Sequence, residues 1–197
     1  MTARLLERER SCLLLIDLQE AYRGKLHQEG QVVHAAARLL EAAALLGLPV
    51  LLTEQYPKGL GPTRAEIAAR LPPGTARFEK TSFSCLGVPE LRERLRRLER
   101  PQVVVAGIET HVCVSQTVHE LLAEGYQPHL VRDAMTSRFA LEDATGFAKM
   151  TGSGAIPSSL EGALFEWLRD ARAPEFKALH RLVAGGREAD PPPRRGP

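Results

Sequence analysis

The stretch from residue 103 to residue 122 constrains the fold more than any other part of this chain. It begins with three valines, passes through Gly107 and continues as a helical pattern of apolar residues from Val114 to Leu122. β-branched residues favour a strand, and a glycine permits a tight change of direction. We therefore expect a buried strand that turns directly into a helix, with Cys113 where the helix begins.

The rest of the chain repeats this alternation of short apolar runs and helical patterns. Strands are expected at residues 12–16, 50–53, 76–80, from 103 to the Gly107 turn, 129–131 and 155–156. Helices are expected at residues 32–46, 63–71, 89–99, 114–122, 141–151, 159–168 and 174–183. This alternation predicts an α/β fold, a three-layer α/β/α sandwich around a mainly parallel six-stranded sheet of the Rossmann-like kind.

Length and composition set the limits of this prediction. The chain has 197 residues, enough for one core, so we expect a single domain over residues 1–184. Residues 185–197 are dominated by Gly, Pro and Arg, and we expect a disordered tail there. A net charge of +2 does not favour a nucleic acid or a membrane surface as the partner.

The cysteine count and the start of the chain bear on location. Three cysteines, an odd number without zinc-motif spacing, do not predict a disulfide framework. Residues 1–10 carry charges of both signs and do not resemble a signal peptide or an anchor. We therefore expect a cytoplasmic protein whose thiols are reduced.

Three chemically active side chains follow predicted strands. Asp17, Lys80 and Cys113 each stand at the carboxyl end of a strand, and ligands of parallel α/β sheets bind beyond that edge. Taken singly, these residues have ordinary explanations: a turn carboxylate, a solvated lysine and a buried thiol. Together they form a nucleophile, a base for its proton and a cation. A helix start and a nearby cation also predict a pKa for Cys113 below the usual value of about 8.5.

Three segments in this order resemble the isochorismatase-like cysteine hydrolase superfamily, which includes nicotinamidases and carbamoylsarcosine amidases. The segments are Leu14-Leu15-Ile16-Asp17-Leu18-Gln19, Phe78-Glu79-Lys80-Thr81-Ser82-Phe83 and Gly107-Ile108-Glu109-Thr110-His111-Val112-Cys113-Val114. Asp133-Ala134 with Ser137-Arg138 matches a further element of the family. The run Thr53-Glu54-Gln55-Tyr56-Pro57-Lys58-Gly59-Leu60-Gly61 is most similar to the isochorismatase domain-containing group.

The resemblance implies a role for each matched residue. Cys113 would be the nucleophile, Asp17 the general base and Lys80 the cation between them. The backbone N–H groups of Glu109 and Cys113 would form the oxyanion hole, with a cis peptide bond between Ile108 and Glu109. The expected activity is a hydrolase acting on a small molecule at an amide-type C–N bond through a Cys113 thioester, without a cofactor. A homo-oligomer, a dimer or a tetramer, would be usual for the family.

Departures from the family pattern and alternatives complete the prediction. Nicotinamidases carry an Asp-x-His metal site after the second strand, which the run at residues 53–56 lacks, so no metal is expected. The substrate-pocket candidates are Gln19, Tyr56, Phe83, His111 and Thr117, with Phe139 as a further candidate; the aromatic residues could equally be core. A non-catalytic metabolite-binding protein or a pseudoenzyme on the same fold is the alternative.

Overall fold

The sheet at the centre of the molecule is parallel throughout. The computed structural model describes residues 5–184, so the predicted tail at 185–197 lies outside the described residues. Six strands pair in the order β3-β2-β1-β4-β5-β6, and every pairing is parallel. Their bounds are β1 Ser11–Ile16, β2 Val50–Gln55, β3 Ala76–Lys80, β4 Gln102–Ile108, β5 Gln127–Thr136 and β6 Ile156–Ser158.

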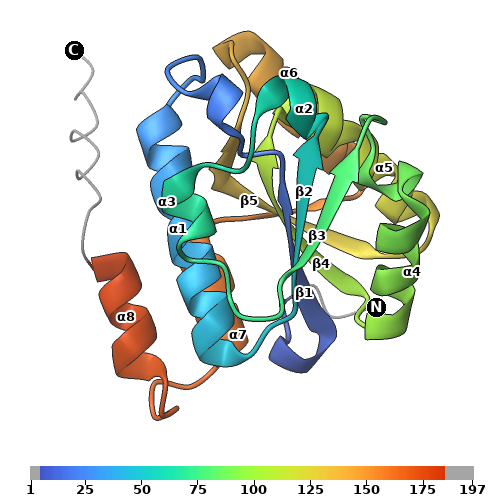
Figure 1. The fold of residues 1–197 in the computed structure, drawn as a ribbon. Coiled ribbons are helices and arrows are strands. Elements are labelled where there is room, and N and C mark those ends of the chain that lie inside the picture. The colour runs from blue at the N-terminus through green and yellow to red at the C-terminus, as the bar shows by residue number, and fades with distance from the viewer. Residues whose placement is uncertain (1–4, 185–197) are drawn as a thin grey trace, which may run out of the picture.

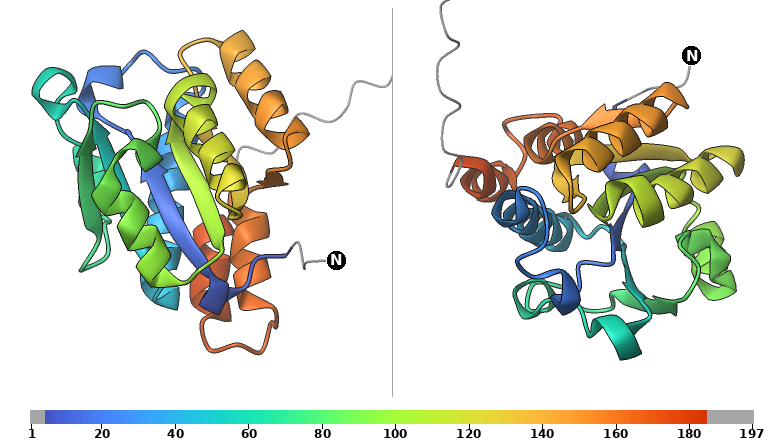
Figure 2. Two further views of the ribbon diagram at one scale, coloured as in Figure 1. Left: turned by 90° about the vertical axis from the view of Figure 1, so that its right-hand side faces the viewer. Right: turned by 90° about the horizontal axis from the view of Figure 1, so that it is seen from above.

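Helices cover both faces of the sheet, as the views in Figures 1 and 2 show. One face carries α1 (Glu29–Leu46), α3 (Ala65–Ala68), α7 (Leu160–Leu168) and α8 (Phe176–Ala184). The other carries α4 (Pro89–Leu98), α5 (Ser115–Ala123) and α6 (Ala140–Gly152). The predicted three-layer α/β/α sandwich is therefore confirmed.

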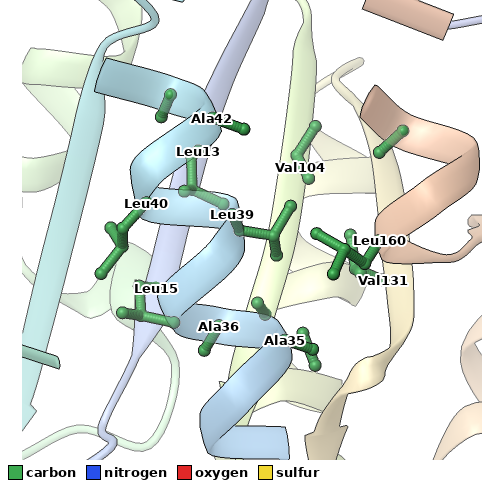
Figure 3. Packing of buried hydrophobic residues seen from close by; sticks show 14 of the residues in the cluster. Leu13, Leu15, Ala35, Ala36, Leu39, Leu40, Ala42, Val104, Val131 and Leu160 are labelled. Carbon is green, nitrogen blue, oxygen red and sulfur yellow. The ribbon is translucent and has the colours of Figure 1, made fainter. Parts of the chain in front are cut away.

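Burial on both faces explains why the central strands are continuously apolar. Leu13 and Leu15 of β1 face α1, while Cys12, Leu14 and Ile16 face the helices of the opposite layer. Figure 3 shows the small and branched side chains of α1 packed on Leu13 and Leu15 and on Val104 of β4. A parallel sheet covered on both faces requires this pattern.

Strands β1 and β4 are neighbours at the middle of the sheet. The chain continues from β1 to β2 and β3 on one side, and from β4 to β5 and β6 on the other, so the strand order reverses between β1 and β4. Gly107 lies where these strands run closest together: a Cβ at this residue would stand 2.0 Å from the carbonyl oxygen of Ile16, and its φ is +119°. Glycine is therefore required there by space and by backbone conformation. The crevice beyond β1 and β4 is where an open α/β sheet binds its ligand.

Several elements differ from their predicted bounds. The strand β5 spans ten residues, where three were predicted, and its pairing with β4 shifts register between Val105 and Gly107. The predicted loop after β2 contains a short helix, α2 (Pro57–Leu60). The segment before α5 is a π-helical turn, Thr110–Val114, so Cys113 does not stand at the start of a regular helix.

Candidate active site

Asp17 is the first residue after β1, and its backbone turns sharply there, with a φ of 54°. Its N–H donates a hydrogen bond to the carbonyl of Thr53 at 3.2 Å, so strand β2 sets the direction of the turn. The hydroxyl of Thr53 also donates to Asp17 Oδ1 at 2.8 Å. The carboxylate is thus buried and held in a fixed orientation by the neighbouring strand.

Lys80 ends the edge strand β3 and reaches across the end of β2. Its Nζ lies 2.7 Å from Asp17 Oδ2, in an ion pair with both side chains buried. The same ammonium donates to Gln55 Oε1 at 2.5 Å and to the carbonyl of Phe83 at 3.0 Å. Burial tends to lower the pKa of Lys80, but the Asp17 carboxylate together with Cys85 and Cys113 outweighs burial and the pKa is raised, which favours the charged ammonium.

Cys113 completes the cluster from the end of β4. Its Sγ lies 3.9 Å from Gln55 Oε1, and its carbonyl accepts a hydrogen bond from Thr117 Oγ1 at 2.6 Å. The thiol also interacts electrostatically with Asp17 and with Lys80. The structure therefore brings the three predicted groups together from three strand ends.

The predicted low pKa of Cys113 is wrong. Burial raises the pKa of this thiol to about 12, the Asp17 carboxylate adds to the rise, and Lys80 offsets part of it. A nearby cation and a helix start lower the pKa of a thiol, but here desolvation and the charge of the carboxylate outweigh them. The resting site therefore holds a neutral thiol beside an ion pair.

The segment before Cys113 has the backbone that the family resemblance implied. The peptide bond between Ile108 and Glu109 is cis. The Glu109 side chain is mostly buried and accepts hydrogen bonds from the backbone N–H of Arg138 at 3.2 Å and from its Nε at 3.0 Å. This ion pair joins the end of β4 to the segment that follows β5.

The predicted pocket residues divide into two groups, and two of them are corrected. Gln19 is fully buried: its carboxamide donates to the carbonyls of Gln55 and Gly61 and accepts from the N–H of Gln55. Thr117 is also fully buried, bonded to the Cys113 carbonyl and to the N–H of Cys85. Both side chains hold loops together rather than line a pocket.

The aromatic candidates are exposed. Tyr56, Phe83 and Phe139 have exposed fractions of 54%, 53% and 64%, so they are not core residues. They follow β2, β3 and β5, at the same edge of the sheet as the cluster. His111 is partly buried, with Nδ1 2.9 Å from Ser137 Oγ and Nε2 3.9 Å from Glu142 Oε2.

Two residues of the site were missed by the sequence reasoning. Thr53 and Gln55 lie two apart on β2, on the same face at its carboxyl end, and contact Asp17, Lys80 and Cys113. Polar residues with a period of two at the end of a buried strand were a usable signal. Cys85 also lies beside these residues, with Sγ 3.7 Å from Thr53 Oγ1.

Residues 5–184 contain no group of three or more His, Cys, Asp or Glu side chains that could hold a metal ion. Over the same range no helix is long and apolar enough to cross a membrane.

Comparison with known proteins places this geometry in a family. A model of the isochorismatase domain matches residues 11–162. The chain belongs to the isochorismatase domain family. Isochorismatase domain-containing protein 2 of Xenopus laevis is 40% identical over 174 residues, which are 88% of this chain and 83% of that protein. The resemblance inferred from the three sequence segments is thus confirmed.

Solved structures show the same isochorismatase-like fold. A Caenorhabditis elegans structure described as MAR1 ribonuclease superposes with a TM-score of 0.88 at 32% identity, covering 98% of this chain and 97% of that one. The YcaC gene product of Escherichia coli, described as an octameric hydrolase of unknown specificity, has a TM-score of 0.86 at 21% identity, covering 92% and 90%.

Proposed function

We propose that this isochorismatase domain is a cysteine hydrolase that cleaves an amide-type C–N bond of a small molecule through a thioester on Cys113. The observation that carries the proposal is the buried Asp17–Lys80 ion pair, which interacts with the Cys113 thiol beyond the switch point of the sheet. A thiol nucleophile needs a base for its proton, and the cluster supplies one.

The first half of the reaction transfers the acyl group to sulfur. Asp17 takes the thiol proton as Cys113 Sγ attacks the carbonyl carbon, and the carbonyl oxygen becomes an oxyanion. The backbone N–H groups of Glu109 and Cys113 stabilise that charge. Asp17 then gives its proton to the nitrogen, the C–N bond breaks and an amine leaves. Because the resting thiol is neutral, proton transfer belongs to the attack itself.

The second half restores the enzyme. Asp17 takes a proton from water, and the resulting hydroxide attacks the thioester carbon. The C–S bond breaks, the carboxylic acid leaves and Cys113 recovers its proton from Asp17. Lys80 remains charged throughout and keeps the carboxylate oriented.

The test is a screen of small primary and N-substituted amides with release of amine as the readout. We expect turnover of a subset, an acyl adduct on the peptide that contains Cys113, and loss of both in Cys113→Ala. Cys12→Ala is the matched control, because Cys12 is buried in the core, and it should retain turnover. Turnover that survives Cys113→Ala would refute the proposal.

Two other functions are separable in the same screen. A metabolite-binding protein or a pseudoenzyme would bind amides without releasing amine. An RNA-cleaving activity, as in the description of the C. elegans relative, is not favoured by a net charge of +2. Cleavage of a labelled RNA by the wild type that persists in Cys113→Ala would favour the RNA-cleaving activity over the amide-cleaving one.

We also infer a homo-oligomer and a cytoplasmic location. The octameric YcaC neighbour supports assembly, and three free cysteines are consistent with a reducing compartment. Light scattering of the purified protein and fractionation of cells test the two inferences.

A further inference from the structure

The side chain of Gln55 contacts both the Lys80 cation and the Cys113 thiol. One oxygen, Oε1, accepts a hydrogen bond from Lys80 Nζ at 2.5 Å and lies 3.9 Å from the Cys113 sulfur, with the thiol as donor. Asp17 also contacts both of these groups, but as a charged carboxylate. Gln55 is uncharged, so it contributes a fixed dipole to the site.

The orientation of this carboxamide is fixed by its other contacts. Gln55 Nε2 donates to the carbonyl of Thr81 at 2.8 Å. Exchanging the amide oxygen and nitrogen would place an NH₂ group against the Lys80 ammonium and a carbonyl against the Thr81 carbonyl. Both contacts would be repulsive, so the thiol always faces the oxygen.

The backbone of Gln55 is also held in place. The fully buried carboxamide of Gln19 donates to the Gln55 carbonyl at 3.0 Å and accepts from its N–H at 2.8 Å. Two glutamines therefore form a chain from the loop after β1 to the sulfur. These contacts hold the Gln55 backbone, so its side chain reaches the sulfur from a fixed position.

We propose that Gln55 is a positioning residue that keeps Cys113 in the thiol form by presenting a carbonyl oxygen to it and by holding the Lys80 ammonium. A carbonyl oxygen accepts a hydrogen bond from S–H and repels S⁻. By accepting from Lys80, it also draws part of the cation's field away from the sulfur. The proposal rests on the proposed function in one respect, namely that Cys113 is the nucleophile.

Other charged and titratable groups face the thiol as well. Asp17 comes from the end of β1, Lys80 from β3 and Tyr22 from the short helical turn Glu20–Tyr22. Glu109 and His111 are near Cys113 in the chain, but their side chains bond to Arg138 and Ser137. A substitution at Gln55 leaves the identity of all five unchanged, and the one of them whose hydrogen bonding it changes directly is Lys80. A change in thiol reactivity can therefore be assigned to position 55.

The test measures alkylation of Cys113 by iodoacetamide, read on its own peptide by mass spectrometry, between about pH 7 and pH 9, below the raised pKa of the thiol. Gln55→Met removes the oxygen and keeps the side-chain length, so we expect alkylation about tenfold faster, equivalent to a pKa lower by about one unit. Gln55→Glu adds a negative charge at the same place, so we expect slower alkylation than in the wild type, by about threefold or more.

The two variants must shift the rate in opposite directions, which a loss of packing alone would not produce. Gln127→Met and Gln127→Glu are the controls and should leave the rate unchanged. Gln127 is the first residue of β5, at the amino ends of the strands, whereas the site is at their carboxyl ends. Equal shifts of the same sign, or no shift, overturn the proposal. If the Met variant does not fold, a Glu variant that reacts as fast as the wild type overturns it alone. Alkylation needs no substrate, so an absence of amide turnover would refute the proposed function and leave this result standing.

Discussion

The three thiols of this chain differ in access more than in acidity. Burial raises the pKa of Cys12 and of Cys113 to about 12 and that of Cys85 to about 11. Cys12 and Cys85 are fully buried, whereas Cys113 retains an exposed fraction of 7%. Reactivity toward reagents in solution is therefore governed by exposure of the sulfur.

This difference predicts the order of labelling. At mildly alkaline pH, iodoacetamide should modify Cys113 before Cys12 and Cys85, because the reagent reaches only that sulfur without local unfolding. Peptide mass spectrometry at short times gives the order, and labelling in denaturant, where the three should react alike, is the control. Labelling of Cys85 ahead of Cys113 would contradict the prediction.

The clustering of three candidate catalytic side chains was predictable from the sequence, whereas the pKa of Cys113 was not. Asp17, Lys80 and Cys113 could be predicted because each follows a strand and parallel strand ends share an edge. The pKa of Cys113 depends on desolvation and on the distance to Asp17, which only the fold specifies. Gln55 was not predicted because a neutral amide is not a candidate acid, base or nucleophile.

Among the elements, β4 and its junction with β1 place Cys113 beside Asp17. Gly107 packs its backbone directly on Ile16, next to the turn that presents Asp17. A side chain there would separate the two strands whose ends carry the base and the thiol.

Substitution of Gly107 tests this junction. Gly107→Ala should destabilise the protein by several kcal/mol or prevent folding, since the new Cβ would meet backbone atoms and its φ is unfavourable. Denaturant unfolding measures the effect. Gly30→Ala, in α1 with open space around it, should be neutral or stabilising by about 0.4–1 kcal/mol. Equal stability of the two variants would contradict the close approach.

Element types followed from sequence more closely than element ends did. The alternation of apolar runs and helical patterns specified the six strands, and β3 has the predicted bounds at residues 76–80. The extension of β5 to Thr136 and the π-helical turn before α5 arise from tertiary pairing and packing, which local patterns do not encode.

At the scale of the whole molecule, one buried histidine should make the free energy of unfolding depend on pH. His129 of β5 is fully buried, and neither ring nitrogen has a hydrogen-bond partner among the described residues. Burial lowers its pKa to about 4 from the ordinary 6.5. Between pH 6.5 and about pH 4, His129 is therefore protonated in the unfolded chain but neutral in the folded one.

Stability should accordingly fall as the pH drops from 6.5 toward 4, by roughly 3 kcal/mol from this residue. Urea unfolding across that range measures the slope. His129→Leu should flatten the profile, whereas His34→Leu, at an exposed position of α1, should leave it as in the wild type. Identical profiles for both variants would refute the assignment.

The chemistry of the whole molecule should also be independent of bound metal. Residues 5–184 offer no cluster of three or more metal-ligating side chains, so prolonged treatment with a chelator should leave amide turnover unchanged. Dialysis against chelator followed by assay is the measurement. Activity that is lost and then restored by zinc or iron would contradict it.

The neutral resting state of Cys113 has a consequence for the lifetime of the protein. Peroxides oxidise thiolates rather than thiols, and oxidation beyond the first step is irreversible. With its pKa raised to about 12, the Cys113 sulfur is mostly in the thiol form near neutral pH, which oxidants consume slowly. If Cys113 is the nucleophile that we propose, the burial that keeps its thiol neutral should also protect it from oxidation between turnovers.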